Sequence, residues 1–203
     1  MLLLDWLSLA LLCFLGAAMP GPSLAVVIQA TARGGFVQGA IAALSHALGV
    51  GIYAVFTVTG LAMIMMTVPG LFMFIQIAGA LFLIYLSLKT LLNEARQEAS
   101  QANSQQSRQS AVKGFLIAFL NPKLLIFFTA LFSQFIHAGL GLAEKSIMVL
   151  TVLLIDGLWY CLVAWLMSRS LVQQKFSSSQ IWLERIFSAA LMFVGCRLLM
   201  LQV

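Results

Sequence analysis

The sequence predicts an all-α membrane protein with six transmembrane helices, arranged as two inverted repeats of three helices. The first observation behind this prediction is composition: the 203 residues are 62% hydrophobic and only 8% charged, with a mean hydropathy of +1.05. Soluble domains average about 25% charged residues. So few charged side chains cannot cover a surface that faces water, which predicts an integral membrane protein.

The second observation is the division of the chain into six apolar segments. Each is close to or longer than the roughly 20 residues that cross about 30 Å of hydrocarbon. The first segment ends at "ARGG" and the second at "TVPG", and the third precedes the hydrophilic stretch "NEARQEASQANSQQSRQS", which is typical of a loop. The segments cover residues 7–32, 37–66, 71–92, 111–136, 146–168 and 182–201.

The distribution of Lys and Arg predicts the orientation. The connections after the first, third and fifth segments carry most of the basic residues, whereas the connection after the second has none and that after the fourth has only Lys145. Because basic loops stay in the cytoplasm, both termini are expected outside, although Arg197 is an exception. Asp5 and the lack of Lys or Arg before the first segment disfavour a cleavable signal peptide, so we expect a retained first span.

The hydrophilic loop divides the chain into a first half (1–92), the loop itself (93–110) and a second half (111–203). An odd number of spans in each half requires the second half to enter the membrane from the opposite side. Three pairs of similar stretches occur in the same order in the two halves: "PGP" and "NPK", "VGIY" and "DGLW", and "YLSLKTLL" and "FVGCRLLM". This order favours an inverted repeat.

Two matched helix breaks predict the substrate site. "PGP" interrupts the first segment of one half and "NPK" the first segment of the other, and paired interruptions are typical of a transporter's binding site. Irregular backbone at membrane depth is tolerated where it faces protein or a water-filled cavity. The alternative is that each proline only kinks a helix for packing. The expected substrate-binding residues are Pro20, Gly21, Pro22, Ser23, Asn121, Pro122 and Lys123.

Each break offers specific chemistry. Pro22 and Ser23 can begin a half-helix whose free N–H groups attract a carboxylate, and Asn121 supplies an amide at the partner break; ordinary capping is the alternative for Ser23 and Asn121. Lys123 lies about ten residues, or roughly 15 Å of helix, beyond Lys113. It could hold a substrate carboxylate, pair with Asp156, or form a salt bridge that only fixes packing.

Two ionisable residues are candidates for proton coupling. Asp156 is the only acidic residue deep inside any segment, where a bare carboxylate is costly and must be protonated, paired or hydrated. It is interpreted as a proton-coupling or amine-binding group, with a structural partner role as the alternative. His46, in "LSHALGVG", could relay protons near neutral pH or simply hydrogen-bond between helices.

These residues lie within stretches that resemble the LysE/RhtB family of amino-acid exporters. "PGPSLAVVIQATARGGFVQGAIAALSHALGVGIYAVFTVTGLA" and "AGALFLIYLSLKTL" are similar to the family's first half, and "GFLIAFLNPKLLIFFTALFSQFI" to the start of its second. The resemblance implies a bacterial inner-membrane secondary transporter that exports amino acids or close derivatives using the proton gradient. In such a membrane, the termini that the basic residues place outside are periplasmic. It also implies a six-helix unit that can form a homodimer in the lipid bilayer.

One departure bears on the substrate. Many relatives have "GD" in the second helix, where this chain has Gly49-Val50. The missing acid weakens the case for a basic amino acid and leaves a slight preference for a neutral one.

Other functional classes fit the sequence less well. No Ser/His/Asp set, HExxH motif or phosphate-binding loop indicates an enzyme, and nothing indicates a cofactor, a metal or a nucleic-acid partner. Cys13, Cys161 and Cys196 show no CxxC spacing, which disfavours a thiol-based carrier. The alternatives that remain are an exporter of another small solute or metal cation on the same architecture and, less favoured, a membrane assembly factor.

Overall fold

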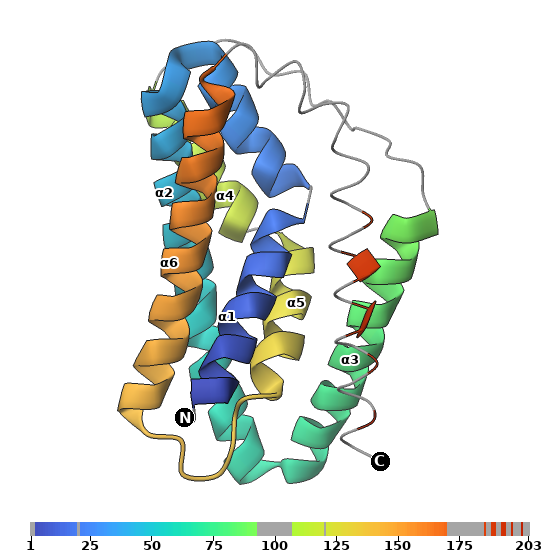
Figure 1. The fold of residues 1–203 in the computed structure, drawn as a ribbon. Helices are drawn as coiled ribbons and strands as arrows, with labels where there is room; N and C mark the ends of the chain where they lie inside the picture. The colour runs from blue at the N-terminus through green and yellow to red at the C-terminus, as the bar shows by residue number, and fades with distance from the viewer. Residues whose placement is uncertain are drawn as a thin grey trace.

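The computed structural model describes residues 3–19, 21–92, 107–119 and 121–169, and isolated positions between 185 and 200. Throughout this part the regular structure is helical, which confirms the all-α class (Figure 1). Apart from those isolated positions, the expected sixth segment, 182–201, lies outside the described residues, as does most of the hydrophilic loop. The helices are α1 (Leu3–Ala18), α2 (Pro22–Thr67), α3 (Pro69–Leu92), α4 (Ser107–Phe119), α5 (Pro122–Ser133) and α6 (Leu142–Met167).

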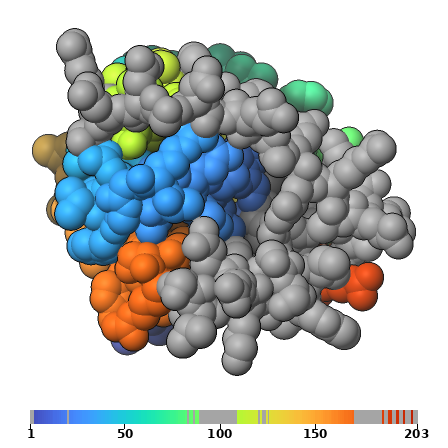
Figure 2. Space-filling model, turned by 90° about the horizontal axis from the view of Figure 1, so that it is seen from above, coloured from blue at the N-terminus to red at the C-terminus, as the bar shows by residue number. Residues whose placement is uncertain are grey.

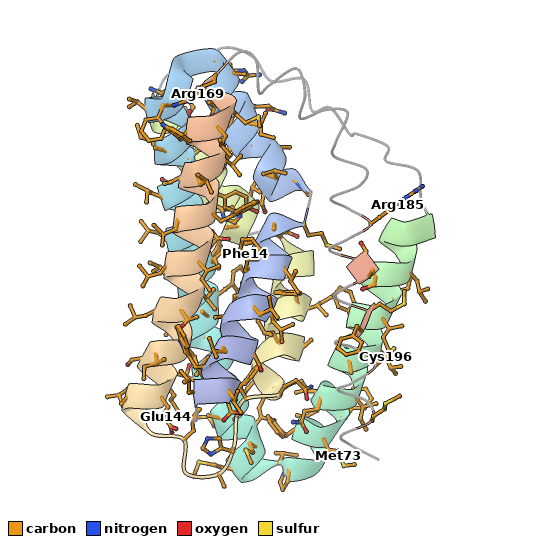
Figure 3. All side chains as sticks on the ribbon, in the orientation of Figure 1. Phe14, Met73, Glu144, Arg169, Arg185 and Cys196 are labelled. Atoms are coloured by element: carbon orange, nitrogen blue, oxygen red, sulfur yellow. The ribbon has the colours of Figure 1, made fainter. Side chains whose placement is uncertain are left out.

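Helices α2 and α6 are long and apolar enough to cross a membrane by length and composition. Charged side chains stand at the two ends of α6: Glu144 at one and Arg169, whose guanidinium lies 4.2 Å from the Trp165 ring centroid, at the other (Figure 3). Side chains on the outer faces are large and apolar, for example Phe56 and Leu158. This arrangement suits a helix bundle surrounded by lipid. The six-span inverted repeat stays a prediction.

Helix α2 is a hairpin of two helical parts rather than one straight rod. Gly34 (φ −134°, ψ 18°) and Gly35 (φ 70°, ψ −169°) leave helical geometry, and the positive φ of Gly35 favours glycine. A Cβ on Gly39 would lie 2.0 Å from the Thr31 Oγ1, although eight residues of straight helix span about 12 Å. The chain therefore reverses at the expected "ARGG" boundary, and its second part returns beside α6 (Figure 1).

Both predicted interruptions are present as true helix breaks. The first expected segment consists of α1 and the first part of α2, and Gly21 is the extended residue before Pro22 begins α2. The fourth consists of α4, which begins ahead of the expected start, and α5, which begins at Pro122. Proline suits the first turn of a new helix because its missing N–H needs no partner there, and its ring opposes continuation of the preceding helix.

The second break is tied to the other half of the chain by Tyr53. Its hydroxyl donates a hydrogen bond to the carbonyl oxygen of Phe119, the last residue of α4, and the two rings lie 5.4 Å apart. A carbonyl at a helix C-terminus has no partner within its own helix. Tyr53 therefore supplies the donor that the break removes.

The core of the bundle depends on small residues. α2 lies between α4 and α6, as the view from above shows (Figure 2). A Cβ on Gly114 of α4 would lie 2.3 Å from the Ala42 carbonyl oxygen, and one on Gly49 would lie 2.9 Å from the Ala118 Cβ. Such residues let helix backbones approach closely in membranes. Gly114 and Gly49 therefore set the distance between α2 and α4.

Helix α3 packs mainly against α5, at the side of the bundle (Figure 1). A Cβ on Gly79 would lie 2.7 Å from the Ala130 Cα, so these two helices also approach closely. The Gln76 Nε2 donates to the Ser133 carbonyl oxygen at 2.7 Å, near the C-terminus of α5. The polar contact satisfies a carbonyl at a helix end, as Tyr53 does at α4.

Gly114→Ala is expected to lower the unfolding temperature of the purified protein in detergent. The new Cβ would meet backbone, which cannot swing aside, so α4 must move away from α2 at a cost of about 1–3 kcal/mol. Gly60→Ala is the matched control, because a Cβ there has nothing within 4 Å. Equal unfolding temperatures for the two variants would contradict the close contact between α2 and α4.

Tyr53→Phe is expected to destabilise the protein by about 0.5–2 kcal/mol, because it leaves the Phe119 carbonyl without its donor while keeping the ring contact. Denaturant unfolding in mixed micelles measures this loss. Tyr85→Phe serves as the control, since Tyr85 is 57% exposed on α3. A Tyr53→Phe protein as stable as the control would show that the hydroxyl does not hold the break.

Candidate functional site

A buried acid–imidazole pair lies between α2 and α6. The His46 Nδ1 lies 2.8 Å from the Asp156 Oδ2, and the two residues are 1% and 6% exposed. Their chain neighbours explain how they meet: a Cβ on Gly157 would lie only 3.4 Å from the Ala47 Cβ, so the two backbones run close together. Because Ala47 and Gly157 are small, the two helices come close enough to place His46 beside Asp156.

This pair can hold a proton. If Asp156 is ionised, the imidazole Nδ1–H donates to it; if Asp156 is protonated, it donates to Nδ1 instead. The His46 Nε2 is buried and has no hydrogen-bond partner among the described residues. The His46 and Tyr160 rings meet edge to face, with 5.0 Å between their centroids. His46 is therefore held on two sides, and a proton can move between its Nδ1 and Asp156.

A cavity of about 40 Å³ opens beside Asp156. This volume has room for a few water molecules. Its polar side is formed by residues from both helix breaks and from α6. These are Gly21, Pro22, Ser23, Asn121, Asp156 and Tyr160.

The structure brings many of the predicted site residues together and leaves others undescribed. Five of them line the one cavity: Gly21, Pro22, Ser23, Asn121 and Asp156. His46 does not line the cavity, but it contacts Asp156, which does.

The other predicted site residues lie wholly or partly outside the described part of the chain. Pro20 is one of these, and for Pro122 and Lys123 only the backbone at the start of α5 is described. The expected contact between Lys123 and Asp156 therefore stays a prediction, as do the binding and proton-coupling roles.

Each break is contacted by a tyrosine from the opposite half of the chain. Tyr160 of α6 lines the cavity together with Ser23, the second residue of α2, and both are buried. Tyr53 of α2 binds the Phe119 carbonyl at the other break. The two halves are thus joined crosswise at the two places where their helices are interrupted.

Sequence reasoning missed the apolar side of the cavity. Cys13, Gly16 and Ala17 of α1 and Leu124, Phe127 and Phe128 of α5 line it, with Met19 and Val152. The small residues at 13, 16 and 17 follow i, i+3, i+4 spacing just before "PGP", a signal that could have placed that face of α1 toward the break. The phenylalanines lie in "LLIFFTALF", where all positions but Thr129 are apolar and no pattern separates the cavity residues from the core.

Comparison with known proteins places these features in a family. The sequence profile described as LysE type translocator matches residues 14–202. An uncharacterized membrane protein of Pseudomonas aeruginosa is 30% identical over 142 residues, which is 67% of this chain and 66% of that protein. No solved structure is significantly similar to the chain.

Two further relatives cover almost the whole chain. The threonine efflux protein of Escherichia coli is 23% identical over 203 residues, 98% of each chain. The threonine efflux protein of Salmonella typhimurium is 23% identical over 197 residues, 95% of this chain and 96% of that protein. With a family profile that matches nearly from end to end, this chain belongs to the family of LysE-type translocators.

Proposed function

We propose that this protein exports neutral amino acids from the bacterial cytoplasm across the inner membrane in exchange for protons. Membership in a translocator family supports transport rather than catalysis, and relatives named as threonine efflux proteins support an amino acid as the cargo. The observation that carries the proposal is that one cavity joins both helix breaks to the buried Asp156.

The cavity suits the two charged groups of an amino acid. The first N–H groups of α2, those of Ser23 and Leu24, have no partners within the helix and face a carboxylate favourably through the helix dipole. Asp156 offers a carboxylate to the ammonium group, and Asn121 can donate or accept. Asp156 is the one charged side chain among the described lining residues, which favours a substrate with an uncharged side chain.

Proton exchange follows from competition at Asp156. A carboxylate that binds the substrate's ammonium group is ionised, and a proton that arrives on it removes that attraction. The His46 imidazole, 2.8 Å away, can pass the proton to it. We propose that the two halves rock about the cavity, so that substrate loads from the cytoplasm and protonation from the periplasm releases it.

Cells that express this protein are expected to survive toxic concentrations of threonine or another neutral amino acid that arrest cells with an empty vector. The reason is faster efflux, which labelled amino acid leaving preloaded cells measures directly. Resistance screening across single amino acids and dipeptides identifies the cargo. If no challenge is relieved and no labelled amino acid leaves faster, the exporter proposal is wrong.

Asp156→Asn is expected to abolish efflux driven by a pH gradient in proteoliposomes, because an amide cannot take up and release a proton. The variant should still insert and purify as the native protein does, since an amide keeps a hydrogen bond with His46. Asp5→Asn, the same chemical change at an exposed position of α1, is the control. Coupled efflux that survives in Asp156→Asn would remove Asp156 from the mechanism.

A further inference from the structure

The cavity has two chemically different walls. Polar groups of Ser23, Asn121, Asp156 and Tyr160 lie on one, and the other is made of α1 and α5 residues without charge, among them Gly16 and Phe127. This step rests on the proposed function: an amino acid whose ammonium and carboxylate groups occupy the polar wall must turn its side chain toward the apolar one.

The apolar wall is closed where Gly16 of α1 meets the ring of Phe127 of α5. A Cβ built on Gly16 would lie 2.4 Å from the Phe127 Cζ and 2.7 Å from its Cε1. Carbon atoms do not approach so closely without a shift, since their optimal separation is about 3.5–4.0 Å. The Phe127 ring holds its present position only because residue 16 has no side chain.

The surroundings of Phe127 decide where a displaced ring would go. Phe127 is 5% exposed and meets Phe128 edge to face, with 5.4 Å between ring centroids. Phe128 in turn stacks on the fully buried Phe132 at 5.8 Å. Because packed cores leave few voids larger than a water molecule, the space open to the ring is the cavity that both residues line.

We propose that Gly16 and Phe127 determine substrate specificity by setting the longest side chain that the transporter accepts. The cavity holds about 40 Å³, room for about three water-sized groups and less than a whole amino acid, so little space remains beside the apolar wall for a side chain. The expected substrates are therefore neutral α-amino acids with short side chains. A methyl group added at residue 16 lowers this limit, and a smaller residue at 127 raises it.

The test measures efflux of labelled alanine, threonine and leucine from proteoliposomes that contain the full-length protein. Gly16→Ala is expected to lower the threonine-to-alanine efflux ratio about tenfold, the effect of one methyl group in a tight pocket. Phe127→Leu is expected to raise the leucine-to-threonine ratio by a similar factor. The double variant should return toward the native threonine-to-alanine ratio, because the smaller residue makes room for the added methyl group.

Controls separate this inference from the proposed function. Gly60→Ala, where a Cβ meets nothing within 4 Å, should keep every ratio. If the native protein exports none of the amino acids, the proposed function fails. If it exports them and neither Gly16→Ala nor Phe127→Leu changes a ratio, the size limit is wrong and the exporter stands. If Gly16→Ala does not fold, as judged by size-exclusion profile, Phe127→Leu alone decides.

Discussion

The structure depends on satisfying backbone polar groups where two helices stop inside an apolar bundle. A buried carbonyl left without a donor costs about 1–3 kcal/mol, and water is scarce at membrane depth. Each break starts its next helix with a proline, which removes one N–H that would need a partner. Side chains supply partners for the remaining backbone groups. The clearest case is the Tyr53 hydroxyl, which donates a hydrogen bond to the Phe119 carbonyl oxygen. The cavity exists because the breaks end helices there.

The buried acid is governed by the same constraint. Asp156 stands where a lone carboxylate is costly, and the imidazole of His46 is its close partner. That contact in turn requires α2 and α6 to approach closely, which Ala47 and Gly157 permit. Small residues beside the pair are therefore as much a part of the site as the ionisable groups, although they carry no chemistry themselves.

Sequence reasoning succeeded where residues have a strong local effect on the backbone. Pro22 predicted a helix start, "NPK" predicted a helix break, "ARGG" predicted the end of the first segment, and Asp156 was the one acid deep among apolar residues. The partners could not be predicted, because pairing depends on how the helices pack. The His46–Asp156 contact joins positions 110 residues apart, and Phe127 faces Gly16 through a contact between α5 and α1 that no periodicity reveals.

The crosswise tyrosines have a consequence for how the chain is assembled during translation. Ser23 is synthesised early, but Tyr160, which lines the cavity beside it, belongs to α6, the last helix described in full. Tyr53 likewise precedes the Phe119 carbonyl that it binds. Neither break can be completed by the half of the chain that contains it. The first break therefore stays incomplete until α6 has been synthesised, so both halves of the chain are needed to reach this structure.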